Sequence, residues 1–155
     1  MLFLLFQLGS DRYALEAGQV VEGLPLVSLK ELPHAPRGVA GLANYREEIV
    51  PVIDLSSLAL GRVAEQRVST RLLMVRYSLP QGGERLLGLV AERATEMLKC
   101  APEDFHETGV ENDEAPYLGP VMRNDRGLIQ RVDIASLLND ELRQALFHQS
   151  AEVTS

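Results

Sequence analysis

Two aspartates in this chain lie in nearly the same local sequence, and carboxylates are among the groups that most often carry out chemistry. Asp54 stands in "VIDLSSL" (52–58), and Asp133 stands in "RVDIASL" (131–137). Two carboxylates can act as general acid and general base when they face one cleft. An Asp between an apolar strand and a short turn can also cap that turn, because its carboxylate accepts backbone N–H bonds. Nothing in the sequence brings the two segments into one cleft, so we expect structural caps rather than a hydrolase site.

Other catalytic and metal-binding signatures are missing from the sequence. None of the common phosphate, dinucleotide, hydrolase or metalloprotease motifs occurs. The three histidines lie in unrelated segments, and with a single cysteine they form no zinc-ligand spacing. Cys100 lies just before the acidic "APEDF", and neighbouring carboxylates raise the pKa of a thiol and lower its reactivity. We therefore expect a protein that is not an enzyme, binds no metal and uses no cofactor.

Charge and composition limit the classes of partner. The net charge of −7 disfavours binding to nucleic acid or to anionic lipid, because both need a basic surface. A single cysteine forms no internal disulfide, which suits a reducing compartment. The opening "MLFLLFQLGSD" lacks a basic leading segment, and its apolar run is too short for a signal peptide or a membrane span. We expect a first strand here, in a soluble cytoplasmic protein without membrane insertion.

Strand signals dominate the elements that must position these residues. Apolar runs on both sides of short polar turns predict four hairpins. They are 2–8 with 12–24, two arms within 38–55 around a tip at 44–48, 70–79 with 85–98, and two arms around "RNDRG" (123–127). The acidic segment 103–114 is predicted to be an exposed connection. Helical spacing and good helix formers predict a C-terminal helix at about 138–149.

The two halves of the chain align with each other in order. Glu22 falls on Glu96 at an offset of 74 residues, Gly41 on Gly119 at 78, and Asp54 on Asp133 at 79. Loop insertions account for the drift. We therefore predict a single domain over 1–155, built from duplicated halves at about 1–62 and 68–138. Short strands at close spacing, twice over, predict an all-β fold of two small antiparallel barrels with a short helical turn after each Asp.

Glu22 and Arg46 are charged residues in unusual places. Glu22 lies between apolar residues in "VVEGL", and Arg46 lies in the polar tip of "ANYREEIVPV". Adjacent strands would join them as a surface ion pair, which contributes only about 0–1 kcal/mol. They would equally mark a surface that binds a partner, since Arg is favoured at interfaces. Spacing alone leaves both interpretations open.

The segment "PHAPRGVAGLANYREEIVPVIDL" (33–55) resembles the central signature of the CheW-like domain. Its Gly41, Asn44, Arg46, Pro51 and Asp54 fall in register with the conserved positions of that signature. The opening hairpin "FQLGSDRYALEAGQVVEGL", the segment "LLGLVAERATEML" and the closing "GLIQRVDIASLL" also resemble the family. The resemblance covers about residues 3 to 138, which is nearly the whole chain.

The resemblance implies two interlaced, five-stranded, Src-homology-3-like (SH3-like) barrels, in agreement with the duplication. It also implies a non-enzymatic adaptor of bacterial chemotaxis-like signalling, which couples the cytoplasmic tip of a methyl-accepting chemoreceptor to the regulatory domain of a CheA-type histidine kinase. The family's Glu and Arg at the positions of Glu22 and Arg46 are associated with receptor coupling. The expected receptor- and kinase-binding residues are Val21, Glu22, Asn44, Tyr45, Arg46 and Glu47. Tyr45 alternatively folds inward as part of the core.

Two departures from the family pattern stand out. Glu47 replaces the Gly that follows the Arg, and "VAE" (90–92) replaces V-V-D. A Gly at a hairpin tip usually supplies a positive φ, which Glu adopts poorly, so we expect a different turn here. Both departures suggest a divergent adaptor that serves an alternative chemosensory pathway. A second class of function stays open, a small-ligand-binding module that uses the cleft between two barrels.

Overall fold

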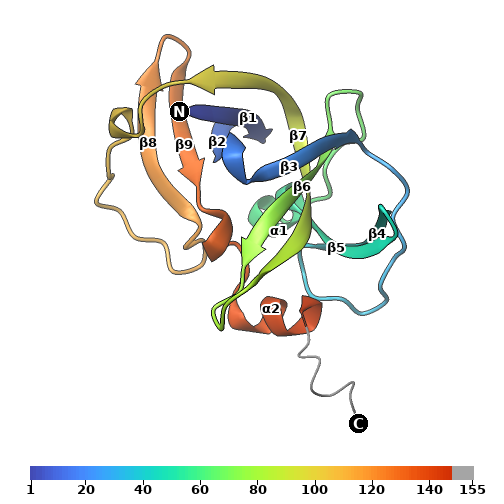
Figure 1. Ribbon diagram of the computed structural model, residues 1–155. Helices are drawn as coiled ribbons and strands as arrows, with labels where there is room; N and C mark the ends of the chain where they lie inside the picture. The colour runs from blue at the N-terminus through green and yellow to red at the C-terminus, as the bar shows by residue number, and fades with distance from the viewer. Residues whose placement is uncertain (148–155) are drawn as a thin grey trace.

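The computed structural model describes residues 1–147, and its strands dominate (Figure 1). The nine strands of these residues are β1 (Leu2–Leu8), β2 (Asp11–Glu16), β3 (Val20–Pro25), β4 (Val39–Tyr45), β5 (Glu48–Asp54), β6 (Arg71–Ser78), β7 (Glu84–Lys99), β8 (Leu118–Asn124) and β9 (Gly127–Val132). The α-helices are α1 (Leu55–Leu60) and α2 (Asp140–Leu146), and short 3-10 turns lie at Ala17–Gln19, Pro102–Asp104 and Ile134–Ser136. Neither helix is long and apolar enough to cross a bilayer.

The strands form two five-stranded, barrel-like sheets that share β7. Barrel 1 has the order β3-β6-β7-β5-β4 and uses residues 84–91 of β7. Barrel 2 has the order β7-β1-β2-β9-β8 and uses residues 92–99 of β7. In Figure 1, β7 arches from β6 towards β8, with β4 and β5 at one side of the molecule and β8 and β9 at the other.

The two barrels are interlaced, because each takes strands from both halves of the chain. The β1–β2 hairpin lies in barrel 2, where β2 runs parallel to β9, and the β6–β7 hairpin lies in barrel 1, where β5 runs parallel to β7. The predicted all-β, interlaced arrangement is confirmed. The sheets do not close as continuous ladders. Each barrel is closed only by an isolated bridge. In barrel 1, Leu42 of β4 bridges to Lys30, which follows β3, and in barrel 2, Val121 of β8 bridges to His106, which follows β7.

The largest hydrophobic core lies between the barrels. Phe6 and Leu15 of barrel 2 belong to the same buried cluster as Leu73 and Leu89 of barrel 1. The central strands β6 and β7 read as continuous apolar runs, because their middle residues are buried on both faces. Each barrel also has a smaller core of its own. The shared core joins the barrels in one body, and the burial of apolar area of this kind is the dominant favourable contribution to folding.

Two predicted elements differ in the structure. The predicted strand 12–24 is interrupted by the 3-10 turn Ala17–Gln19, so that its two arms serve different barrels as β2 and β3. The predicted helix at 138–149 begins at Asp140, because the Asn139 side chain accepts a 2.8 Å bond from Leu142 N and caps the helix. Helix α2 ends at Leu146, and the last part of the predicted range lies outside the described residues.

Candidate functional site

Glu22 on β3 meets the tip of the β4–β5 hairpin at one rim of barrel 1. Its Oε1 atom accepts a hydrogen bond from the Tyr45 hydroxyl at 2.5 Å and a second from Arg46 Nη2 at 2.8 Å. Tyr45 packs in the core of barrel 1 and is only 7% exposed as a residue, while its hydroxyl reaches Glu22 at the rim. The Arg46 guanidinium lies 4.9 Å from the centre of that ring, within cation–π range. One carboxylate oxygen therefore orders two side chains of the hairpin.

The hairpin turn at the tip contains no glycine. Arg46 and Glu47 join the paired residues Tyr45 and Glu48, and their φ angles are 50° and 68°. Two-residue hairpins favour turns with positive φ at both central residues, because these match the twist of the strands. Glu47 therefore adopts the positive φ that its side chain was expected to disfavour, because strand pairing overrides the preference of the side chain. Each non-glycine residue held in this region costs about 1–3 kcal/mol.

The ion pair at this rim orders the side chains but contributes little to the stability of the fold. The Arg46 side chain is 69% exposed and that of Glu22 is 35% exposed, so their ion pair contributes only about 0–1 kcal/mol. The hydrogen bond to Glu22 raises the pKa of Tyr45, and burial raises it further. The hydroxyl consequently keeps its proton, and its role as donor, throughout the neutral range. The pair leaves most of the guanidinium open to a partner.

The remaining predicted site residues lie around this rim with different orientations. Glu47 is exposed at the tip, and Val21 is half-buried against the core of barrel 1. Asn44 is exposed on the face of β4 opposite to Tyr45, because neighbouring side chains alternate along a strand. It pairs there with Ile49, which is 71% exposed. Ile49 was missed by the sequence interpretation, because "IVPVI" (49–53) is a continuous apolar run that does not indicate which of its residues is exposed.

Barrel 2 carries a counterpart of this site at the β8–β9 tip. Glu96 of β7 corresponds to Glu22, and it accepts a bond from Arg126 at 3.1 Å. Both side chains are more than half exposed, at 57% for Arg126 and 56% for Glu96. Asn124 ends β8 where Tyr45 ends β4, and its amide oxygen accepts bonds from Arg12 and from the Arg126 backbone. The counterpart therefore has the ion pair without the tyrosine.

Asp54 ends β5 and Asp133 directly follows β9, so each lies at the joint between a strand and a short helical turn. Asp54 is 5% exposed, and its two oxygens accept bonds from Ser57 N at 3.1 Å and from Ala64 N at 2.9 Å. Asp133 is exposed and accepts bonds from Ala135 N at 3.2 Å and from the Ser136 hydroxyl at 2.8 Å. Each carboxylate is thus engaged as a cap of the helical turn that follows it.

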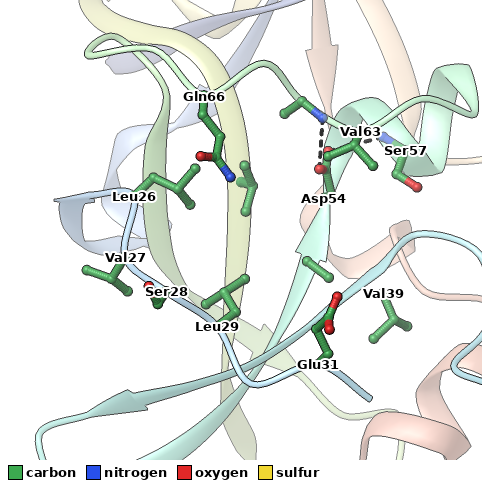
Figure 2. A pocket seen from close by; sticks show the side chains of 13 residues that line it. Leu26, Val27, Ser28, Leu29, Glu31, Val39, Asp54, Ser57, Val63 and Gln66 are labelled. Atoms are coloured by element: carbon green, nitrogen blue, oxygen red, sulfur yellow. Dashed lines mark hydrogen bonds between the residues drawn. The ribbon is translucent and has the colours of Figure 1, made fainter. Parts of the chain in front are cut away.

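A hollow of about 390 Å³ lies beside the first of these joints (Figure 2). Its wall combines apolar residues, among them Leu26, Leu29, Val39 and Val63, with polar residues such as Glu31 and Gln66. Figure 2 shows Asp54 beside it with its carboxylate bonded to backbone nitrogens, so that it does not offer its oxygens to a ligand. A ligand site should have polar groups that converge in an apolar cleft. The hollow is lined by barrel 1 and its connections and does not lie between the barrels, so it gives no support to the small-ligand alternative.

The metal-ligating side chains and the cysteine of residues 1–147 were the other candidates for chemistry. Within this range, no three His, Cys, Asp or Glu side chains are placed to hold a metal ion. Cys100 is half-buried, and burial first and Asp104 second raise the pKa of its thiol. The sequence attributes this shift to acidic neighbours alone, whereas the structure makes burial the larger cause.

Comparisons with known proteins agree with the resemblance. The model of the CheW-like domain matches residues 2–142. The chemotaxis protein CheW of Helicobacter pylori is 30% identical over 128 residues, which cover 80% of this chain and 73% of that protein. The chemotaxis protein CheW of Treponema pallidum is 26% identical over 146 residues, covering 91% and 84%.

A solved structure shares the fold. The crystal structure of the scaffolding protein TtCheW from Thermoanaerobacter tengcongensis matches with a TM-score of 0.78 and 21% sequence identity, covering 91% of this chain and 89% of that one. The match supports the assignment of the two sheets as SH3-like barrels. The chain therefore belongs to the CheW-like domain family, as its segment 33–55 indicates.

Proposed function

We propose that this chain is a non-enzymatic adaptor that couples the cytoplasmic tip of a methyl-accepting chemoreceptor to the regulatory domain of a CheA-type histidine kinase. Membership of the CheW-like family supports the class of function. One observation supports the docking site: Arg46 is fixed by Glu22 and packed on Tyr45, yet its side chain is 69% exposed.

A fixed and exposed guanidinium suits recognition of another protein. Its fork of N–H donors matches carboxylates and carbonyl oxygens with defined geometry. Because the bond to Glu22 and the contact with Tyr45 already restrict Arg46, little further side-chain entropy is lost when a partner binds. The exposed Ile49 on the outer face of the same hairpin adds an apolar contact. We assign the receptor contact to this rim of barrel 1, with Val21, Asn44 and Glu47 around it.

The kinase contact requires a second surface, because an adaptor binds both partners at once. In each barrel the end strand, β4 or β8, pairs with its neighbour along one edge, and its other edge carries only an isolated bridge. Edge strands of this kind keep backbone donors and acceptors that can pair with an edge of another barrel. We assign the kinase regulatory domain to these barrel edges. Because both proposed partners present cytoplasmic parts, we infer that the chain acts in the cytoplasm.

The acidic tip gives the receptor contact its own character. Glu47 and Glu48 are exposed next to Arg46, where the family pattern has a Gly after the Arg. Two negative charges beside the docking arginine disfavour a partner with a carboxylate-rich surface. We infer that the chain serves a receptor different from those of members with Gly, in an alternative chemosensory pathway.

Reconstitution from three purified components tests the proposed function. The full chain, a receptor cytoplasmic fragment and a kinase regulatory domain from the same organism are mixed, and capture of the kinase domain on immobilised receptor is measured. Wild type is expected to bridge the two, and Arg46→Glu is expected to lose receptor capture while it retains the kinase domain. Arg126→Glu, the matched change at the other tip, is expected to keep both. Failure of the wild type to capture either partner would contradict the proposal.

A further inference from the structure

We propose that Tyr45 is a positioning residue for the docking hairpin: through Glu22, its hydroxyl holds Arg46 and the left-handed turn at 46–47 in the shape that a partner meets. The claim that Tyr45 holds the turn does not depend on the proposed function, whereas the claim that this affects docking rests on it. The sequence left open whether Tyr45 faces a partner or the core. The structure assigns it a third role, in which it acts through its neighbours.

The position of Tyr45 leaves little of it for direct contact. Its ring is buried in the core of barrel 1, and only 7% of the residue is exposed. Its hydroxyl donates a 2.5 Å bond to Glu22 Oε1, the same atom that receives Arg46 Nη2 at 2.8 Å. Because both bonds end on one oxygen, a displacement of Tyr45 displaces the carboxylate and with it the guanidinium. The aromatic ring also supports that guanidinium from below at 4.9 Å.

The turn needs to be held because its backbone is unfavourable for its residues. Arg46 and Glu47 have φ angles of 50° and 68°, a region in which residues other than Gly, Asn and Asp are uncommon. Such conformations persist where the surroundings over-determine them. Here the β4–β5 pairing fixes the base of the turn, and the bond from Arg46 to Glu22 fixes one of its two central residues from outside.

The β8–β9 hairpin of barrel 2 provides a natural control for this inference. Its turn residues, Asp125 and Arg126, are not among the described residues with positive φ, and Gly127 takes the left-handed position at 114°. Asn124 stands there in place of Tyr45, and Glu96 bonds Arg126 without a second donor from an aromatic residue. The tyrosine thus occurs at the tip where the backbone is strained and is absent from the tip where glycine relieves it.

Tyr45→Phe separates the hydroxyl from the ring. The variant keeps the apolar packing and stays folded, as checked by circular dichroism, and its thermal midpoint should fall only as far as the loss of one hydrogen bond requires. Amide hydrogen exchange at 46–48 should become faster than in wild type, and this readout needs no partner. The affinity for a receptor cytoplasmic-tip fragment should fall by about three- to tenfold, as expected for the loss of one hydrogen bond that orders the site.

Rescue at position 47 distinguishes positioning from direct contact. Asn tolerates the left-handed conformation, whereas Gln does not, and both remove the charge of Glu47. Adding Glu47→Asn to Tyr45→Phe should therefore restore most of the slow exchange and most of the lost affinity. Adding Glu47→Gln to the same background should restore neither. The two double variants differ only in the residue that must adopt positive φ.

Each outcome bears on a different part of the inference. Restoration by Asn alone supports the positioning role. Weakened binding that neither variant restores, with exchange as in wild type, overturns it in favour of direct contact. If Tyr45→Phe changes neither exchange nor affinity while Arg46→Glu abolishes binding, the inference is wrong and the proposed function stands. If exchange rises but Arg46→Glu binds the receptor fragment as wild type does, the hold on the turn is supported and the docking site of the proposed function is wrong.

Discussion

The two barrels present hairpin tips at corresponding positions, and the tips are built differently. In barrel 1, the carboxylate of Glu22 is 35% exposed and receives both Arg46 and the buried Tyr45. In barrel 2, the pair of Glu96 and Arg126 is more than half exposed on both sides and has no aromatic donor. The same pair of charges is therefore held in an ordered hydrogen-bond arrangement in barrel 1 and is a solvated surface ion pair in barrel 2. The difference supports the proposal that docking takes place on barrel 1.

The joints of the two barrels show the same contrast. Asp54 is buried and binds two backbone amides that lie seven residues apart, at Ser57 and Ala64. Asp133 is exposed and binds one backbone amide and one hydroxyl within its own turn. Two copies of a motif can thus share a geometry and still contribute different free energies of folding, because the loss of a hydrogen bond costs more where the groups are buried.

The largest expected effect is the difference in stability lost when each capping aspartate is replaced by alanine. Asp54→Ala should lower the free energy of unfolding by about 2–4 kcal/mol, because it removes the cap of α1 and leaves two backbone N–H groups without their partner. Asp133→Ala should cost about 1 kcal/mol, the usual value for an exposed cap. Chemical denaturation of both variants measures the difference. Equal losses would show that burial of the first joint carries no additional weight.

A smaller effect compares the two tip carboxylates. Glu22→Ala should destabilise by about 1–2 kcal/mol, because the carboxylate accepts two hydrogen bonds, one of them from a mostly buried tyrosine. Glu96→Ala should stay within about 0.5 kcal/mol, as expected for an exposed pair. Thermal unfolding at low and at high salt gives both values. A Glu96→Ala loss as large as that of Glu22→Ala would remove the distinction between the tips.

The smallest effect concerns alkaline pH. The bond to Glu22 raises the pKa of Tyr45 above its ordinary value of 10.0, so the folded state binds this proton more tightly than the unfolded state does. The resulting stability is complete below about pH 10 and is lost as the pH rises through the folded pKa. Burial raises the pKa of Tyr13 and Tyr117 in the same direction, so wild type must be compared with Tyr45→Phe.

Unfolding midpoints measured from about pH 9 to about pH 11 provide this comparison. Tyr45→Phe should lose less stability than wild type over the upper part of the range. Parallel curves for the two proteins would mean that the hydroxyl of Tyr45 does not contribute through Glu22.

Much of this architecture could be predicted from the sequence because it depends on local pattern. The order of matches from Glu22–Glu96 to Asp54–Asp133 indicates two copies of one unit, and the strand-Asp-turn pattern indicates the capping bonds that the structure shows. The interlacing was expected from the family resemblance alone. It depends on long-range parallel pairings such as Ala14 with Arg131, which no local signal specifies.

The details of the tip were less predictable. Single-residue preference suggested that Glu47 would alter the turn, but the pairing of Tyr45 with Glu48 imposes positive φ on both residues between them. Whether Tyr45 faced outward or inward was open, because a tyrosine at the end of a strand can satisfy either face. Its role became visible only when the fold brought β3 beside the hairpin, which put Glu22 within reach of the hydroxyl.

The affinity of a receptor cytoplasmic-tip fragment for Arg46→Glu and for Arg126→Glu tests the central claim most directly. Both variants change the net charge equally and break one glutamate–arginine pair at a hairpin tip. Isothermal titration at one ionic strength should show binding weakened by at least about 30-fold for Arg46→Glu, as for a hot-spot residue, and by less than about twofold for Arg126→Glu. Equal losses, or a larger loss for Arg126→Glu, would contradict the assignment of docking to barrel 1.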